Sequence, residues 1–483
     1  MKLLLLSRAI IAFAALSLTA CVTVGPDYSP PATETPPAWN RMDKTSRPET
    51  PDEDVGDISQ WWRNLNDPLL TQLVEEALRG SPDLRSALAK VREARARRGV
   101  ASSRLFPEVT AAGNYRHSRS SEDTGSGDTR ELFSAGFDAS WELDVFGGIR
   151  RGVEAAGADL AAAEANLRDT LVSLAAETAR NYIEARTQRL LLSIARDNLA
   201  SQSETLRITE WRAQAGLVSS QDVEQARTSL EQTRALIPRL EITLAEAEHS
   251  LEILLGRTPG SLQSRLSVAG DLPSLPKKIA VGIPADTLRR RPDVRVAERK
   301  LAAETARVGV AEAARYPSFT LSGSVGLEAL TLSALGNSGS ATYSLLAGVT
   351  TPIFNAGRLR SQVDIQDAVR EQALVSYEKT VLGALRDVEN ALVGLARTSD
   401  RGEALAKALT AARAAEQLAR QRYTTGLIDF QSVLTTQRTT LTVEESLASN
   451  RSDGVLALIS LYKALGGGWT SQAVTPPAGK DTP

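Results

Sequence analysis

The sequence predicts an α+β membrane protein made of two copies of one unit, each with a β-hairpin and a very long helical hairpin. Three observations predict this fold. The two halves match at a constant spacing, as Pro82 and Pro292 show, so that matched residues lie 210 positions apart. Both halves contain runs of about 10 residues in which apolar and polar side chains alternate. Both halves also contain helical stretches nearly free of proline, far longer than ordinary globular helices.

The composition excludes several classes of protein. In 483 residues, 56 Lys and Arg stand against 58 Asp and Glu, so nothing indicates a nucleic-acid partner. Cys21 is the only cysteine, and His117 and His249 are the only histidines, which argues against a disulfide framework or a zinc site. Phosphate-loop and serine-hydrolase motifs are absent. Enzyme functions are therefore weakly supported by the composition, and we expect no catalytic residues, no metal and no cofactor beyond a covalent lipid.

The N-terminus has the pattern of an export signal. Residues 1–20 combine a basic start with a short apolar run from Ile10 to Leu18, too short to span a membrane. The following Leu18-Thr19-Ala20-Cys21 resembles a bacterial lipobox, in which the cysteine carries lipid. The alternative is an ordinary signal peptide followed by a chance cysteine. Several acyl chains on Cys21 would form a durable anchor, and residues 21–55, rich in Pro and Thr, would then act as a lipidated tether.

The internal repeat sets the domain boundaries. We assign residues 56–256 to repeat 1, residues 257–290 to a connector, residues 291–466 to repeat 2 and residues 467–483 to a tail. The matched pairs include Pro82 with Pro292, Arg97 with Arg307, Gly113 with Gly323, Gly216 with Gly426, and Leu255 with Leu465.

The alternating runs predict one β-hairpin per repeat, at about 108–145 and about 318–354. In the best run, residues 133–144, one face is apolar and the other is polar. The apolar face includes Phe133, Phe137 and Trp141, and the polar face includes Asp138, Glu142 and Asp144. A sandwich with one wet face would give the same alternation. Because four strands cannot close around a lumen, either the edges are covered or several chains pool their hairpins.

The helical stretches predict a long hairpin in each repeat, at about 150–256 and about 358–465. Each is interrupted at the same relative place, by Gly216-Leu217 and by Gly426-Leu427. Glycine in the left-handed region ends a helix and reverses the chain. A soluble pair of coiled-coil hairpins is the alternative, but it does not explain the attached strands.

These segments together resemble the outer membrane factor family, the TolC-like and NodT-type lipoprotein channels of tripartite efflux systems. The resemblance covers Cys21 to about Trp469 and rests on several motifs: Trp61-Trp62, Asp144-Val145-Phe146-Gly147-Gly148, Leu288-Arg289-Arg290-Arg291-Pro292-Asp293-Val294 and Arg422-Tyr423. It implies a homotrimer whose chains give four strands each to a 12-stranded transmembrane β-barrel, continuous with a long periplasmic α-helical barrel.

The resemblance also implies a location and a function. The protein would be lipid-anchored in the outer membrane of a Gram-negative bacterium and would extend into the periplasm. It would be a passive exit duct for drugs or other small toxic compounds, served by a periplasmic adaptor (membrane fusion) protein and an inner-membrane pump of the resistance–nodulation–division (RND) type. The alternatives are an exit duct for type I protein secretion and a periplasmic lipoprotein that is not a channel.

By the same resemblance, the tips of the helical hairpins hold a periplasmic gate. Its candidate residues are Asp222, Tyr423, Gln221, Arg422 and Asp429, with a hydrogen bond expected between Asp222 and Tyr423. The candidate adaptor-docking residues are Gly216, Leu217, Gly426 and Leu427. Asp138, Glu142 and Asp144 are expected to line the barrel lumen. For the gate residues the alternative is solvated side chains at helix ends, and for the tip residues it is turn chemistry alone.

Overall fold

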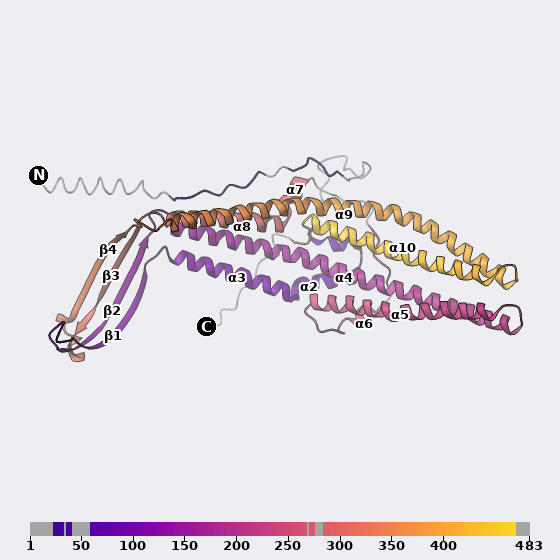
Figure 1. Ribbon diagram of the computed structural model, residues 1–483, viewed down its shortest axis with the longest axis horizontal. Coiled ribbons are helices and arrows are strands. Elements are labelled where there is room, and N and C mark those ends of the chain that lie inside the picture. The colour runs from indigo at the N-terminus through magenta and orange to yellow at the C-terminus, as the bar shows by residue number, and fades with distance from the viewer. Residues whose placement is uncertain (1–22, 33–34, 41–57, 268–269, 276–283, 470–483) are drawn as a thin grey trace. The chain divides into compact units, whose positions relative to one another are not determined.

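The computed structural model describes residues 23–32, 35–40, 58–267, 270–275 and 284–469 (Figure 1). The signal peptide and Cys21 lie outside these residues, so the lipidation expected at Cys21 is outside the described part of the chain. The chain forms two compact units. Of the described residues, unit 1 contains 23–32, 89–165 and 295–379, and unit 2 contains 35–40, 58–88, 166–267, 270–275, 284–294 and 380–469.

Unit 1 contains a four-stranded antiparallel sheet in the order β1-β2-β3-β4 (Figure 1). The strands are β1 (Glu108–Arg119), β2 (Thr129–Leu143), β3 (Ser318–Ala329) and β4 (Ala341–Thr350). Two short 3₁₀ turns, η3 (Leu332–Ala334) and η4 (Ser338–Ser340), lie between β3 and β4. The alternating runs thus form strands as predicted, and the two hairpins join side by side through β2 and β3.

The register of the sheet separates apolar from polar side chains. Val325 on β3 lies opposite Phe137 on β2 and Tyr343 on β4. These three side chains point to one face and are 60%, 58% and 89% exposed. On the other face Ser324 lies opposite Asp138, and its hydroxyl is 2.7 Å from that of Ser344. The sheet therefore has an apolar face that is largely uncovered by the described residues, apart from Trp141 at its end, whose indole N–H donates to the Leu105 carbonyl (3.1 Å).

Long helices adjoin the sheet in sequence. They are α3 (Pro82–Ser103), α4 (Gly148–Gln214), α8 (Pro292–Ala313) and α9 (Arg358–Thr424). Each of these helices has residues in both units.

The first described residues pack on the helices of unit 1. The buried Arg151 guanidinium of α4 donates to the Val24 carbonyl (3.2 Å) and to Asp27 (2.6 Å). Gly25 has a φ of +88°, and a Cβ there would lie 2.4 Å from the Cα of Gly309. Residues 24–27 of the expected tether are therefore held against the helices in unit 1, whereas Trp39 packs in unit 2 with Val388 and Leu461.

Unit 2 contains the remaining helices. They are η2 (Ile58–Leu65, a 3₁₀ helix), α2 (Pro68–Gly80), α5 (Ser220–Leu254), α6 (Gln263–Leu266), α7 (Pro284–Arg290) and α10 (Phe430–Ala464). In Figure 1, α5 runs back along α4, and α10 runs back along α9. Both α4 and α9 have 67 residues, and both α5 and α10 have 35. The two helical hairpins start at Gly148 and Arg358, which keeps the spacing of 210 seen in the sequence.

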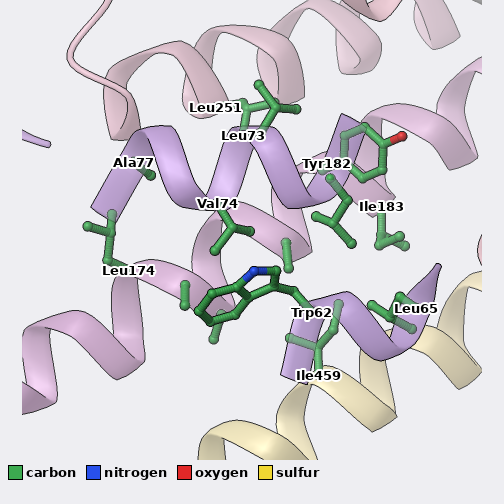
Figure 2. Packing of buried hydrophobic residues seen from close by; sticks show 14 of the residues in the cluster. Trp62, Leu65, Leu73, Val74, Ala77, Leu174, Tyr182, Ile183, Leu251 and Ile459 are labelled. Atoms are coloured by element: carbon green, nitrogen blue, oxygen red, sulfur yellow. The ribbon is translucent and has the colours of Figure 1, made fainter. Parts of the chain in front are cut away.

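The main core of unit 2 gathers segments that are far apart in sequence (Figure 2). Trp61 of η2 is fully buried and stacks on Tyr462 of α10, with 5.3 Å between the ring centroids. Asp67 caps α2 by accepting from the backbone N–H of Leu69 (2.9 Å), and it also accepts the Tyr182 hydroxyl of α4 (2.7 Å). Burial, and then this hydrogen bond, raise the pKa of Tyr182 above its ordinary value. One aspartate thus ties α2 to α4.

Candidate functional site

The two helical hairpins reverse direction through the same glycine-based turn. Helix α4 ends before Gly216 (φ +73°) and α9 ends before Gly426 (φ +78°). At each turn the glycine N–H bonds back three residues at 3.0 Å, and the next leucine N–H bonds back five residues, at 2.8 Å for Leu217 and 2.9 Å for Leu427. These two hydrogen bonds together form the Schellman motif. Their acceptors are carbonyl groups that the end of a helix would otherwise leave without partners.

A serine and an aspartate three residues apart cap each helix that follows a tip. The serine comes first at α5, and the aspartate comes first at α10. At the start of α5, the Ser219 hydroxyl accepts from the Asp222 N–H (3.3 Å), and the Asp222 carboxylate accepts from the Ser219 N–H (3.0 Å). At the start of α10, the Asp429 carboxylate accepts from the Ser432 N–H (3.0 Å) and hydroxyl (2.6 Å). The Ser432 hydroxyl and then its N–H lower the pKa of Asp429. Both aspartates therefore serve their own helix.

Arg212, near the end of α4, links the two tips of the chain. Its Nη1 donates to the backbone carbonyls of Tyr423 and of Thr424 (3.2 Å for the latter), in the last turn of α9. Its guanidinium carbon lies 4.5 Å from the centroid of the Tyr423 ring. A cation at these carbonyls also compensates the negative end of the helix dipole. Arg212 thus caps α9 from the neighbouring hairpin.

A small apolar cluster lies below this contact. Tyr423 is buried, and its ring centroid is 5.4 Å from that of Phe430 on α10. Ala226 of α5 and Val433 and Leu434 of α10 complete the buried part. Because α5, α9 and α10 all contribute, the cluster holds the two hairpins together at their tips.

The hydrogen bond expected between Asp222 and Tyr423 is not formed, which corrects the sequence-based prediction. The Asp222 carboxylate is engaged by Ser219, and the Tyr423 hydroxyl is buried with no hydrogen-bond partner among the described residues. Gln221 and Arg422 are exposed on the tips, and within the described chain the Arg422 side chain makes no hydrogen bond or ion pair. Of the five proposed gate residues, the tip cluster contains only Tyr423.

The tip leucines are presented to solvent. Leu217 is 67% exposed and Leu427 is 74% exposed. Two large apolar side chains held outward by rigid turns are typical of a surface that binds a partner.

The residues proposed for a lumen divide into two groups. Asp138 and Glu142 are exposed on β2 and share the face opposite Trp141 and Phe137. Asp144 is not on this face, because β2 ends at Leu143, and this corrects the prediction. Its carboxylate accepts from the N–H groups of Ile149 (3.0 Å) and Arg150 (2.8 Å), so it caps α4.

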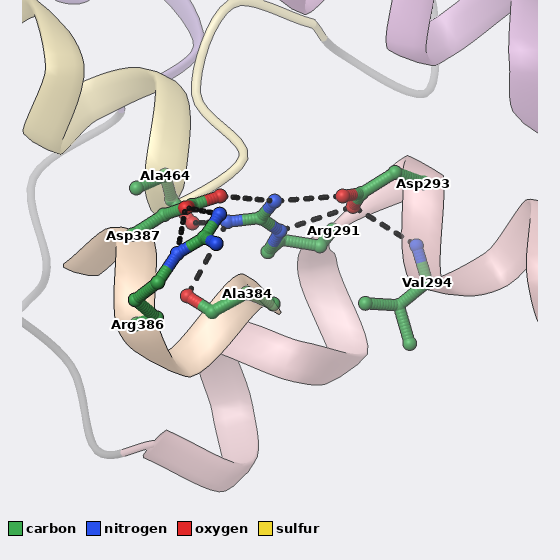
Figure 3. Close-up of polar contacts among 7 residues, drawn as sticks. All are labelled: Arg291, Asp293, Val294, Ala384, Arg386, Asp387 and Ala464. Atoms are coloured by element: carbon green, nitrogen blue, oxygen red, sulfur yellow. Dashed lines mark hydrogen bonds and ion pairs between the residues drawn. The ribbon is translucent and has the colours of Figure 1, made fainter. Parts of the chain in front are cut away.

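An ion-pair network that the sequence did not predict joins three helices in unit 2 (Figure 3). The buried Arg291 binds Asp293 through two nitrogens (3.0 and 2.6 Å), reaches Asp387 of α9 (3.3 Å) and donates to the Ala464 carbonyl (3.0 Å). Burial alone would lower the pKa of Arg291, but the bonds and charges of Asp293 and Asp387 raise it. Burial, and then the charge of Asp293, raise the pKa of the nearby Asp169. The Arg-Pro-Asp sequence was the available signal for this site.

The described residues hold no cluster of metal ligands. No group of three or more His, Cys, Asp or Glu side chains in them is placed to hold a metal ion. Across the same residues, no helix combines the length and the apolarity that crossing a bilayer requires.

Comparisons with known proteins agree on one family. The sequence model described as outer membrane efflux protein matches the chain twice, at residues 73–257 and 283–467. Nodulation protein T of Rhizobium leguminosarum bv. trifolii is 33% identical over 473 residues, which are 95% of this chain and 97% of that protein. The pyoverdine export outer membrane protein OpmQ of Pseudomonas putida is 32% identical, with the same coverage. Among solved structures, the outer-membrane channel OprN superposes with a TM-score of 0.85 at 37% identity, covering 92% of this chain and 99% of that one.

Proposed function

The chain belongs to the outer membrane efflux protein family, and from this premise we propose that it is the passive outer-membrane exit duct of a tripartite efflux pump. The duct would be a homotrimer that carries drugs or other small toxic compounds across the periplasm and the outer membrane. Energy would come from an inner-membrane RND-type pump, coupled through a periplasmic adaptor protein.

The open sheet carries this proposal. Among the described residues, β1 and β4 each have one neighbouring strand, so the outer edge of each is unpaired there. Unpaired edges and an exposed apolar face are unfavourable in water, but both are satisfied when sheets join edge to edge inside a lipid bilayer. Three copies would give 12 strands, an even number like that of other bacterial outer-membrane barrels. Asp138 and Glu142 would then face the lumen.

The helices of unit 2 support the same assembly. Several large apolar side chains on α5 and α9 are exposed in the single chain: Ile242, Ile253, Leu382 and Leu418. Scattered exposed apolar residues are normal on a protein surface. These residues, however, lie on two helices of the repeated hairpins, so each hairpin offers an apolar surface to a neighbouring hairpin. Burying them between copies would close the helical hairpins into a tube.

The tips are where the tube would open and bind its adaptor. The proposed gate consists of Asp222, Tyr423, Gln221, Arg422 and Asp429, with the last turns of α4 and α9 as the moving parts. Because the Tyr423 hydroxyl has no hydrogen-bond partner within the described segments, a change of tip packing could supply one without unfolding a helix. The docking site for the adaptor would be Leu217 and Leu427, held outward by Gly216 and Gly426.

The N-terminus would fix the duct in the outer membrane of a Gram-negative bacterium. We assign the signal peptide to residues 1–20 and a covalent lipid to Cys21. Radiolabelled palmitate incorporation should be lost in Cys21→Ser, while the duct itself still assembles. Incorporation that persists in this variant would reject the assignment.

Deleting the gene tests the function. The deletion should raise susceptibility to a panel of small toxic compounds, and the wild-type gene should restore resistance. Leu427→Asp should reach the membrane, fail to restore resistance and lose capture by the adaptor. Thr435→Asp, at an exposed site on α10, is the matched control and should behave as wild type. Unchanged susceptibility together with loss of a secreted protein would instead assign the duct to protein secretion.

A further inference from the structure

The contact made by Arg212 has a counterpart in the repeat. Adding 210 to Arg212 gives Arg422, at the same place in the last turn of α9. Both residues sit at the same step of a Schellman turn, since their carbonyls accept the N–H of Leu217 and of Leu427. The side chains of the two arginines therefore project from equivalent backbone positions.

Only one of these arginines finds a partner inside the chain. Arg212 donates to the last carbonyls of α9 and stacks on Tyr423. The Arg422 side chain is exposed, and its guanidinium makes no hydrogen bond or ion pair among the described residues. The acceptors that correspond to Tyr423 and Thr424 are Ala213 and Gln214, in the last turn of α4. No single chain can supply both contacts when each hairpin lies beside the other on one side only.

A ring of three copies contains two kinds of junction. At one kind of junction, the first hairpin of a chain lies beside the second hairpin of the same chain. At the other kind, the second hairpin of one chain lies beside the first hairpin of the next chain. Because the hairpins have the same lengths and the same turns, the second kind should repeat the geometry of the first.

We propose that Arg422 donates to the carbonyls of Ala213 of the partner subunit and Gln214 of the partner subunit, capping its α4 and joining adjacent copies at the tips. The proposal rests on the homotrimeric duct proposed above. The chemistry is that of Arg212: a guanidinium meets the last carbonyls at the negative end of a helix. The Ala213 carbonyl also accepts the Gly216 N–H of its own turn, as the Tyr423 carbonyl accepts that of Gly426. Arg422 is thereby assigned a helix end as its partner, in place of an acidic side chain.

The two junctions differ in strength. The junction within a chain has the Tyr423 ring under the guanidinium, whereas the corresponding position between chains is Ala213. The contact between copies keeps the capping hydrogen bonds and lacks the cation–π contribution. The tips should therefore separate first between chains, while each chain keeps its own pair of hairpins together.

Cross-linking tests the predicted proximity. Arg422→Cys combined with Ala213→Cys, treated with a short bis-maleimide in the detergent-solubilised protein, should give dimers and trimers on a gel after boiling. The pair related to it by the repeat, Arg212→Cys with Tyr423→Cys, is the matched control and should link only within one chain. Each single variant controls for the native Cys21.

Light scattering before labelling separates the two ways of failing. An intact trimer that gives no product between chains overturns the Arg422 junction and leaves the duct standing. A particle with one chain overturns both the duct and the junction.

Conductance tests the role of the charge. In planar bilayers, Arg422→Gln should raise the open probability of the isolated trimer about tenfold, the factor that corresponds to about 1.4 kcal/mol. The open probability of Arg422→Lys should lie between those of Arg422→Gln and wild type, since lysine keeps the charge and loses the planar guanidinium with its several N–H donors. Ala213→Tyr should lower the open probability by supplying the missing ring, and Gln214→Tyr, one residue away, should not. Equal behaviour of the two tyrosine variants, or of Arg422→Gln and wild type, would contradict the proposal.

Discussion

Replacing Arg291 by methionine removes the centre of the ion-pair network in unit 2 while keeping a long apolar side chain. Arg291 lies between α7 and α8 and is the only residue in its network that reaches Asp293, Asp387 and the end of α10 together. The neighbouring Arg290 is exposed, so Arg290→Met removes the same charge from the same segment without touching the network.

The geometry sets the size of the effect. Four hydrogen bonds of 3.3 Å or shorter are lost, two to Asp293 and one each to Asp387 and Ala464. Breaking a buried pair costs about 3–5 kcal/mol when the remaining charge stays without compensation. Asp387 keeps its ion pair with Arg386 (2.9 Å), so Asp293 is the carboxylate that loses its partner. The Asp293 and Asp387 side chains are 31% and 39% exposed and regain part of their hydration. We therefore expect the lower end of the range, about 3 kcal/mol, which is roughly a 100-fold change in a local opening equilibrium.

Hydrogen exchange measured by mass spectrometry on the detergent-solubilised protein can detect this change. In Arg291→Met, peptides from the start of α8 and the end of α10 should lose protection by about two orders of magnitude. Peptides of the tips should not change, and Arg290→Met should match wild type throughout. If Arg291→Met left the α10 peptide as protected as in wild type, the network would not hold these helices and the reasoning would be wrong.

Three further predictions concern the sheet and the tips. Val325→Arg, on the apolar face, should make the free energy of insertion into outer-membrane vesicles less favourable by about 2–4 kcal/mol. Ser324→Arg, on the other face, should insert as wild type does. Gly426→Val forces a branched side chain to a φ of +78° and should cost at least 1–2 kcal/mol, lowering the melting temperature of the tips more than Gly383→Val, at an open helical site, does. Because the pKa of Asp429 is lowered in the folded chain, its cap is fully present above the ordinary aspartate pKa and is lost as pH falls through the lowered value; exchange in the first turn of α10, corrected for intrinsic rates, should follow this dependence and lose it in Asp429→Asn.

Much of the fold follows from local patterns in the sequence. Strand alternation and helix length depend on neighbouring residues, so the hairpins and the glycine turns at Gly216 and Gly426 could be predicted. Asp144 shows the limit of this reasoning. Asp144 continues the polar side of the alternation in β2. Its carboxylate instead accepts from two N–H groups at the start of α4, which have no partner within the helix.

The tip contacts could be predicted only in part, because they depend on which helix ends meet in space. The serine three residues before Asp222 is a capping-box signal, and it explains why Asp222 binds Ser219 in place of Tyr423. The contact of Arg212 with the end of α9 crosses 211 positions, and no local pattern indicates such a partner. The repeat supplies the missing information once one of the two junctions has been seen.

Native mass spectrometry of the protein released from detergent tests the central claim most directly. A duct assembled from open four-stranded sheets should give particles of three chains, with no stable population of one chain. A homogeneous particle containing one chain would contradict it, since an isolated sheet with two unpaired edges encloses no passage.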